Sequence, residues 1–188
     1  MEKLKILGTD HKILDIDDFI LAGKSKEDVL GIVYGTPIIG QRVLAVENWF
    51  RLLWNKDGVK LGEYNSSTSE AVQILSGMED TKHYAALGDN DTAPSVCWKY
   101  GKGGLQWYLP SVMELAAIFL YRDKINDTIK LLDIDDVFLP EFDEDRSDVW
   151  SSTRFLDNYV WCINFNTGSF YPNEMDTPLV TTLAISKL

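Results

Sequence analysis

The sequence is poor in the residues from which catalytic and metal sites are most often built. Its 188 residues include two cysteines, Cys97 and Cys162, and two histidines, His11 and His83. A single disulfide is the most that they allow, and we interpret both cysteines as buried free thiols that pack as small apolar side chains. The histidines lie far from the cysteines in the sequence, so no metal and no cofactor are predicted.

Positive charge and long apolar runs are also scarce. Eighteen Lys and Arg residues stand against 29 Asp and Glu residues, a formal net charge of −11. Such a surface repels phosphate backbones and anionic headgroups, so we expect neither nucleic acid nor membrane as a partner. No apolar run reaches the roughly 18 residues that a spanning helix needs, so no membrane insertion is predicted. The chain reaches Asp10 before any apolar run of secretory length, so we expect it to be unexported unless a leader was trimmed.

Enough apolar material is present for one compact domain. Hydrophobic residues make up 45% of the chain, which allows a sizeable core. Residues 1–28 mix short apolar runs with charge and predict an N-terminal arm or edge hairpin. The main domain is predicted over residues 29–188. It begins with residues 29–34 and 41–46, where apolar and β-branched residues flank a Gly-Thr-Pro turn and predict a hairpin.

Residues that cap helices precede two further stretches. Ser67 or Thr68 is placed to cap a helix over about residues 70–78, where apolar residues recur at helical spacing. Thr92 is placed to cap a second short helix. The glycine-rich run at residues 101–104 ends that helix with residues that tolerate positive φ.

The strongest helix signal lies in the middle of the chain. Ser111 followed by Glu114 forms a capping box, and apolar residues continue from it on one helical face. Residues 125–132 predict another short helix. Residues 149–164 and 179–185 alternate between apolar and polar residues, which is typical of strands.

Two tryptophan-centred motifs stand out in the C-terminal half. The first is Leu-Gln-Trp-Tyr-Leu-Pro-Ser-x-x-Glu-Leu at residues 105–115. The second is Val-Trp-Ser-Ser-Thr at residues 149–153, followed by Tyr-Val-Trp-Cys-Ile-Asn-Phe-x-x-Gly at residues 159–168. In this order, after the hairpin, they resemble the bacterial and phage domain named for the C-terminal domain of a collagen-like adhesin, also called the major paralogous domain.

This resemblance implies an α+β, C-type-lectin-like fold, in which short helices pack on a small twisted antiparallel sheet with long loops on one side. It implies attachment or ligand binding, and it moves Trp107, Trp150 and Trp161 into the core. The chain departs from the family at its end. Members usually close with an arginine-containing strand, whereas residues 179–186 contain no arginine, so the ligand contacts of those arginines are not carried over.

Calcium binding and oxidase chemistry remain alternatives. Acidic runs at residues 89–91, 133–136 and 143–145 offer oxygen ligands, but they lack the Glu-Pro-Asn and Trp-Asn-Asp patterns of calcium-dependent lectins, and solvated loops are the usual role of such runs. The formylglycine-generating oxidases are structural cousins of the family. An oxidase of that type would need Cys97 and Cys162 as a reactive pair in an open groove.

A hydrolase nucleophile is the remaining enzymatic alternative. Ser151 and Ser152 are candidates by type, but both histidines are remote in sequence, so no catalytic triad is indicated. We instead expect these serines and Thr153 to satisfy backbone groups at a bend where a strand meets a loop. The chain is therefore predicted to be no enzyme.

The most ligand-like surface is predicted in loops of the C-terminal half. Residues 154–159 and 166–176 are rich in Tyr, Asn, Ser and Gly, which provide rigid rings and versatile hydrogen bonds in recognition loops. An ordinary polar loop is the competing interpretation. The candidate ligand-binding residues are Arg154, Phe155, Asp157, Asn158, Tyr159, Asn166, Tyr171, Asn173 and Glu174.

These observations favour a non-enzymatic binding protein. The main hypothesis is a phage virion component, a fibre or decoration protein assembled in the host cytoplasm and acting as an oligomer. Residues 1–28 would then dock it to other virion subunits, and its loops would bind a host cell-surface glycan or protein. The alternative is an extracellular or cell-surface adhesin domain of a bacterium that binds glycan or protein.

Overall fold

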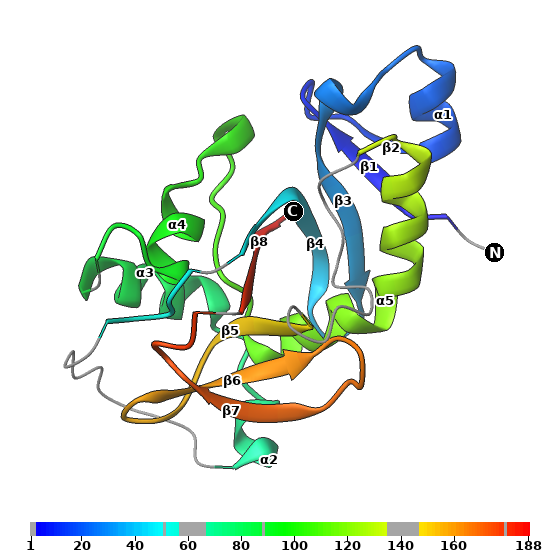
Figure 1. The fold of residues 1–188 in the computed structure, drawn as a ribbon. Helices are drawn as coiled ribbons and strands as arrows, with labels where there is room; N and C mark the ends of the chain where they lie inside the picture. The colour runs from blue at the N-terminus through cyan, green and yellow to red at the C-terminus, as the bar shows by residue number, and fades with distance from the viewer. Residues whose placement is uncertain (1–2, 51, 57–66, 88, 135–146, 179) are drawn as a thin grey trace.

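The computed structural model describes residues 3–50, 52–56, 67–87, 89–134, 147–178 and 180–188. Within these residues, eight strands form one mixed sheet in the order β2-β1-β3-β4-β8-β5-β6-β7 (Figure 1). The strands are β1 (Lys5–Gly8), β2 (Ile13–Asp15), β3 (Val29–Thr36), β4 (Gly40–Phe50), β5 (Asp148–Leu156), β6 (Tyr159–Asn164), β7 (Phe170–Glu174) and β8 (Thr181–Lys187). The helices are α1 (Ile16–Leu21), α2 (Thr68–Ala71), α3 (Gly77–Leu87), α4 (Ala93–Lys99) and α5 (Val112–Leu131), with 3-10 turns η1 (Lys26–Asp28) and η2 (Lys102–Gly104).

The last strand lies in the middle of the sheet. β8 pairs antiparallel with β4 on one side and parallel with β5 on the other, where the register joins Val149 to Thr181. The other neighbouring strands pair antiparallel. A bulge between Leu44 and Asn48 interrupts the β4–β8 ladder. The chain end therefore joins the two halves of the sheet, β2-β1-β3-β4 and β5-β6-β7.

This architecture corrects the expected C-type-lectin-like arrangement of short helices on a small antiparallel sheet. The sheet is larger and mixed, and the main helix α5 has 20 residues. The hairpin of β1 and β2 extends the sheet at one edge, so residues 1–28 contain the expected edge hairpin. Residues 170–174 extend it at the other edge as β7, which pairs with β6. From the sequence, the first edge was predicted as an arm or hairpin and the second as a loop, because the strands at both edges are short.

Two helix predictions were also wrong in extent. The helix expected over residues 70–78 is two helices, α2 and α3, with Gly77 at the start of the second. The two helices expected after Ser111 are one continuous helix, α5, because no Gly or Pro interrupts residues 112–131. Within the described residues, no helix is both long and apolar enough to cross a membrane.

Several local predictions are confirmed. β3 and β4 form the expected hairpin, with Val33 opposite Val43. Ser67 caps α2 by accepting a hydrogen bond from the backbone N–H of Glu70, and Thr92 is the N-cap residue of α4. The glycines of the run at residues 101–104 have positive φ. These elements were predictable because each depends on residues close together in sequence.

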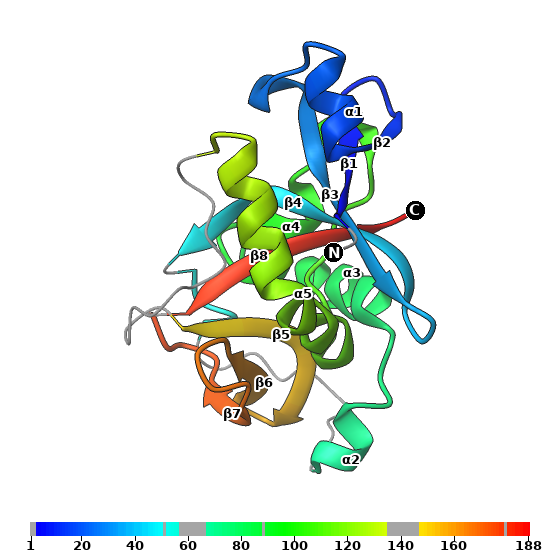
Figure 2. The same cartoon turned by 90° about the vertical axis from the view of Figure 1, so that its right-hand side faces the viewer.

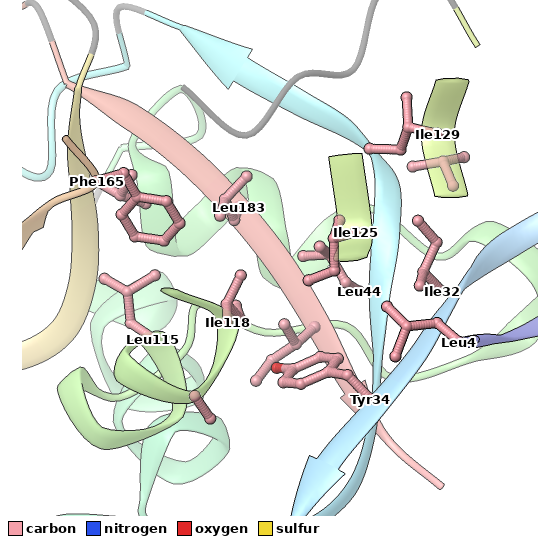
Figure 3. Packing of buried hydrophobic residues seen from close by; sticks show 14 of the residues in the cluster. Leu4, Ile32, Tyr34, Leu44, Leu115, Ile118, Ile125, Ile129, Phe165 and Leu183 are labelled. Carbon is pink, nitrogen blue, oxygen red and sulfur yellow. The ribbon is translucent and has the colours of Figure 1, made fainter. Parts of the chain in front are cut away.

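Two hydrophobic clusters cover the two faces of the sheet. Residues along β6 alternate between them: Trp161 and Ile163 belong to the cluster under α5, whereas Val160 and Cys162 belong to the cluster on the side of α3 and α4. Figure 2 shows α5 crossing in front of the sheet. Figure 3 shows side chains of α5, including Ile125, facing residues of β3, β4 and β8. The expected core tryptophans, Trp107, Trp150 and Trp161, are buried.

A buried carboxylate lies where α5 begins. Glu114 is fully buried and accepts hydrogen bonds from Nε of Arg42 at 2.9 Å and from the hydroxyl of Tyr108 at 2.7 Å. The backbone N–H and hydroxyl of Ser111 donate to its other oxygen at 3.0 and 3.1 Å. This confirms the capping box and adds a buried ion pair to β4. Gly77 leaves the space for the carboxylate, since a Cβ there would lie 2.4 Å from its Oε2.

Replacing Arg42 with Met should destabilise the fold by about 3–5 kcal/mol, because it leaves the buried Glu114 carboxylate without its counter-ion. Chemical denaturation would measure the free energy of unfolding. The control is Lys12→Met, which removes an exposed pair with Asp10 at 3.9 Å and should cost at most about 1 kcal/mol. Adding Glu114→Gln to Arg42→Met should recover part of the loss. Equal losses for Arg42→Met and Lys12→Met would contradict the role of the ion pair.

A second partly buried carboxylate lies in α3. The pKa of Asp80 is raised from its ordinary value of 3.8 to about 6. Burial is the main cause, and the carboxylates of Glu79 and Glu114 add to it, whereas the hydrogen bond that the hydroxyl of Ser76 donates at 2.8 Å lowers the pKa. The folded chain therefore holds this proton more tightly than the unfolded chain does. The resulting stabilisation is present in full below the unfolded pKa and is lost as the pH rises through about 6.

Asp80→Asn should therefore stabilise the chain at neutral pH, by up to about 3 kcal/mol, and should remove part of the fall in stability between pH 4 and pH 7. Urea denaturation at several pH values would measure the difference between variant and wild type. Asp157→Asn alters a carboxylate that is 91% exposed, so its pH profile should follow the wild type. A variant at Asp80 with the wild-type slope would contradict the raised pKa.

Candidate binding site

A pocket of about 390 Å³ opens where β1, the β3–β4 hairpin and α5 meet. Its wall includes three lysines: Lys3 and Lys5 from the N-terminal segment, and Lys124 from α5. A second pocket of about 280 Å³ shares Lys3 and Lys124 with the first and continues along α5. We call the two pockets together the lysine groove. Its place follows from β1, which brings the start of the chain beside the middle of α5.

The charge of the groove is opposite to that of the chain. The described residues that line the larger pocket include three lysines and no Asp or Glu, although the chain has a formal net charge of −11. Nζ of Lys3 pairs with Asp17 at 2.7 Å. Within the described part of the chain, neither Lys5 nor Lys124 forms an ion pair. Their charges remain available to an anion.

The aromatic wall of the groove is held in place. The hydroxyl of Tyr121 donates to the backbone carbonyl of Gly35 at 2.9 Å, and its ring centroid lies 6.3 Å from that of Tyr34. Nζ of Lys124 lies 5.6 Å from the Tyr121 ring centroid. Thr36 and the exposed Gln41 add polar groups on the hairpin side. The groove thus combines positive charge, a fixed ring and neutral polar groups.

Tyr34 forms the inner wall and faces the core. Burial, followed by the nearby Glu114 carboxylate, raises the pKa of its hydroxyl well above the ordinary value. That hydroxyl has no hydrogen-bond partner among the described residues. Tyr34 thus connects the groove, which it lines, with the buried pair of Glu114 and Arg42, whose charges act on its hydroxyl.

Part of the predicted loop surface is buried. Arg154 lies in β5 with its side chain 1% exposed, and it donates hydrogen bonds to the carbonyls of Leu156 and Asp157 at 3.3 and 3.1 Å. The ring of Phe155 packs edge-to-face on Trp161 with centroids 5.1 Å apart. These two candidates support the β5–β6 turn.

The remaining candidates lie on β6, on β7 and in turns. Asp157 and Asn158 are exposed in the turn, and the hydroxyl of Tyr159 donates to Glu174 at 2.9 Å. Asn166 occupies a turn after β6. Tyr171, Asn173 and Glu174 lie in β7 instead of the expected loop.

Hydrogen bonds within this surface occupy part of its binding capacity. Oδ1 of Asn173 accepts from the backbone N–H of Glu174 at 2.9 Å and from the hydroxyl of Thr177 at 3.0 Å. Burial and a hydrogen bond to Asp148 raise the pKa of Tyr171. That this surface binds a ligand stays a prediction, whereas the lysine groove was not predicted at all. Its residues are ordinary in sequence and come together only through the pairing of β1 with β3.

The residues on which the oxidase and calcium alternatives depend have other contacts in the structure. Cys97 and Cys162 are free and fully buried, and burial raises both pKa values, so neither thiol offers the open reactive pair that the oxidase alternative needs. Lys56 pairs with Asp89 and Asp91 at 2.9 and 3.2 Å, which places a protein cation where calcium was considered. Within the described residues, no His, Cys, Asp and Glu side chains gather into a metal site. Residues 135–146 lie outside the described residues.

Two of the three side chains in the Ser-Ser-Thr motif satisfy backbone groups, as expected, whereas the hydroxyl of Ser152 has no hydrogen-bond partner among the described residues. The hydroxyl of Ser151 donates to the carbonyl of Trp161 at 2.6 Å, and Oγ1 of Thr153 accepts from the backbone N–H of Val112 at 3.0 Å. The backbone N–H of Ser152 donates to the carbonyl of Pro110 at 2.8 Å. The motif lies inside β5, where it attaches the start of α5 to the sheet.

No protein-family model and no curated protein matches the chain, so the family resemblance stays a prediction. A solved structure, a fimbrial protein from Bacteroides ovatus ATCC 8483, is similar to it with a TM-score of 0.62 and 13% sequence identity. The match covers 100% of this chain and 49% of that one, so the chain spans about half the length of that protein. At this identity the likeness concerns the fold alone.

Among the candidate ligand residues, Arg154 should matter mainly for stability. Arg154→Met leaves the carbonyls of the β5–β6 turn without their donor and should cost about 1–3 kcal/mol in the free energy of unfolding. Tyr159→Phe removes only the exposed hydrogen bond to Glu174 and should leave the free energy of unfolding nearly unchanged. Thermal and urea denaturation would compare them. Equal effects would contradict the division of this surface into a buried support and an exposed part.

Proposed function

We propose that this chain is a non-enzymatic binding domain of a bacterial surface or secreted adhesin, with a glycan or protein as its ligand. One observation carries the proposal: the whole chain shares its fold with part of a fimbrial protein. The lysine groove supports it, because pockets of about 300–1,000 Å³ are typical of sites for small ligands. The groove has about 390 Å³ in its larger part.

The surface role is favoured over the virion role by the same comparison. The similar structure is named as a fimbrial protein, and neither the fold nor the groove has a feature that points to a phage particle. The residues that an oxidase would need are buried thiols. A binding role thus agrees with the described geometry, because it requires no reactive group.

Protease treatment of intact producing cells would test the proposed location. The protein should be cleaved on intact cells and detected in the surface or secreted fraction by an antibody, while a cytoplasmic marker stays intact. Beads coated with the purified chain should also adhere to a mucin layer or to cultured cells more than albumin-coated beads do. A protein that is protected inside intact cells, or that copurifies with phage particles, would overturn the proposal.

A further inference from the structure

We propose that the lysine groove binds a carboxylated sugar, such as a uronic or sialic acid residue of a glycan. The inference names the ligand class of the proposed adhesin and rests on that function. Three features of the groove carry it: its local charge, its fixed aromatic wall, and a lining whose described residues include neither an arginine nor a helix N-terminus.

Local charge selects an anion. Among the described residues that line the larger pocket, Lys3, Lys5 and Lys124 carry charge and none is a carboxylate. Lys3 is partly neutralised by Asp17, and Asp127 lines only the adjoining pocket. Two ammonium groups thus face the larger pocket without an ion-pair partner among the described residues. This number of cations matches a ligand with a single negative charge better than a polyanion.

The wall of the groove suits a sugar ring. Tyr121 is fixed by its hydrogen bond to Gly35 and its contact with Tyr34, so its ring needs little ordering when a ligand binds. Rigid aromatic side chains give binding sites large contact area at low entropic cost. Thr36 and Gln41 line the same pocket, and hydroxyl and amide groups bond well to sugar hydroxyls. The site therefore offers both an apolar surface and polar partners.

Phosphate is the less suitable anion here. Lysine binds phosphate as a point charge, whereas the bidentate fork of arginine and the N–H groups of a helix N-terminus match several phosphate oxygens at once. Within the part of the chain that the structure describes, no arginine lines either pocket. Lys124 lies in the second half of α5, far from the N-terminus of that helix at Val112. Lysine ammonium groups act as point charges, which suffices for a carboxylate held by the rest of a sugar.

Binding of matched acidic and neutral sugars to the full chain would test the inference. The probes are sialyllactose with lactose, and methyl galacturonoside with methyl galactoside, measured by calorimetry or on a glycan array. At least one acidic probe should bind ten times more tightly than its neutral partner, and its affinity should fall as salt concentration rises. Binding by one acidic probe alone supports the proposal and identifies the source of the sugar. Equal binding of acidic and neutral probes overturns it.

Charge reversal locates the site. Lys5→Glu with Lys124→Glu should weaken binding of the acidic probe at least tenfold. The control, Lys82→Glu with Lys99→Glu, makes the same change in net charge on α3 and α4, and should leave affinity within twofold. Lys5→Gln with Lys124→Gln repeats the test with less perturbation, and thermal unfolding checks that each variant is folded. Unchanged binding by both groove variants overturns the proposal.

Two outcomes separate this inference from the proposed function. Adhesion and surface exposure without any binding of acidic sugar would leave the adhesin role standing and overturn the groove. Groove-dependent sugar binding by a protein that stays inside the cell would support the groove and overturn the adhesin role. A polyglutamate peptide is the last probe, and if it binds as tightly as the acidic sugars and competes with them, the groove is a site for acidic protein segments and the sugar proposal fails.

Discussion

The rest of the structure depends on the buried carboxylate of Glu114. A charge with no contact to water is tolerated only when its oxygens are fully hydrogen-bonded. Here the donors are Arg42, Tyr108 and Ser111, which come from β4, from the segment before α5 and from the cap of α5. The requirement to satisfy one carboxylate therefore fixes where α5 starts relative to the sheet.

That fixed start lets one helix hold the two halves of the sheet together. The halves meet at β8, where the pairing with β5 is a short parallel contact. α5 packs against β3 in one half and against β5 and β6 in the other, so the apolar face of the helix spans the junction. Tyr108 adds a bridge to Ile185 of β8. The position of Lys124 at the groove follows from the same rigid helix.

What could be predicted from the sequence was local. The β3–β4 hairpin and the Ser111–Glu114 box each rest on neighbouring residues, and the structure confirms them. The three tryptophans that the resemblance assigned to the core are buried as well. β7 could not be predicted, because Pro172 normally argues against a strand and is accepted here at a sheet edge. α3 begins at Gly77, which lies against Glu114, a residue distant in sequence. Strand order and sheet size depend on such distant pairs throughout.

The charge of the candidate site also could not be predicted from the sequence. The net charge of −11 argues against long polyanions, which would meet the whole acidic surface. At physiological salt, however, exposed charges are screened beyond about 8 Å. A small anion inside the groove would therefore be attracted mainly by the lysines that line it, because the repulsion from distant carboxylates is screened. Composition predicts the partners of the surface as a whole, but the fold decides the charge that a small ligand meets, because β1 and α5 bring Lys5 and Lys124 to one pocket.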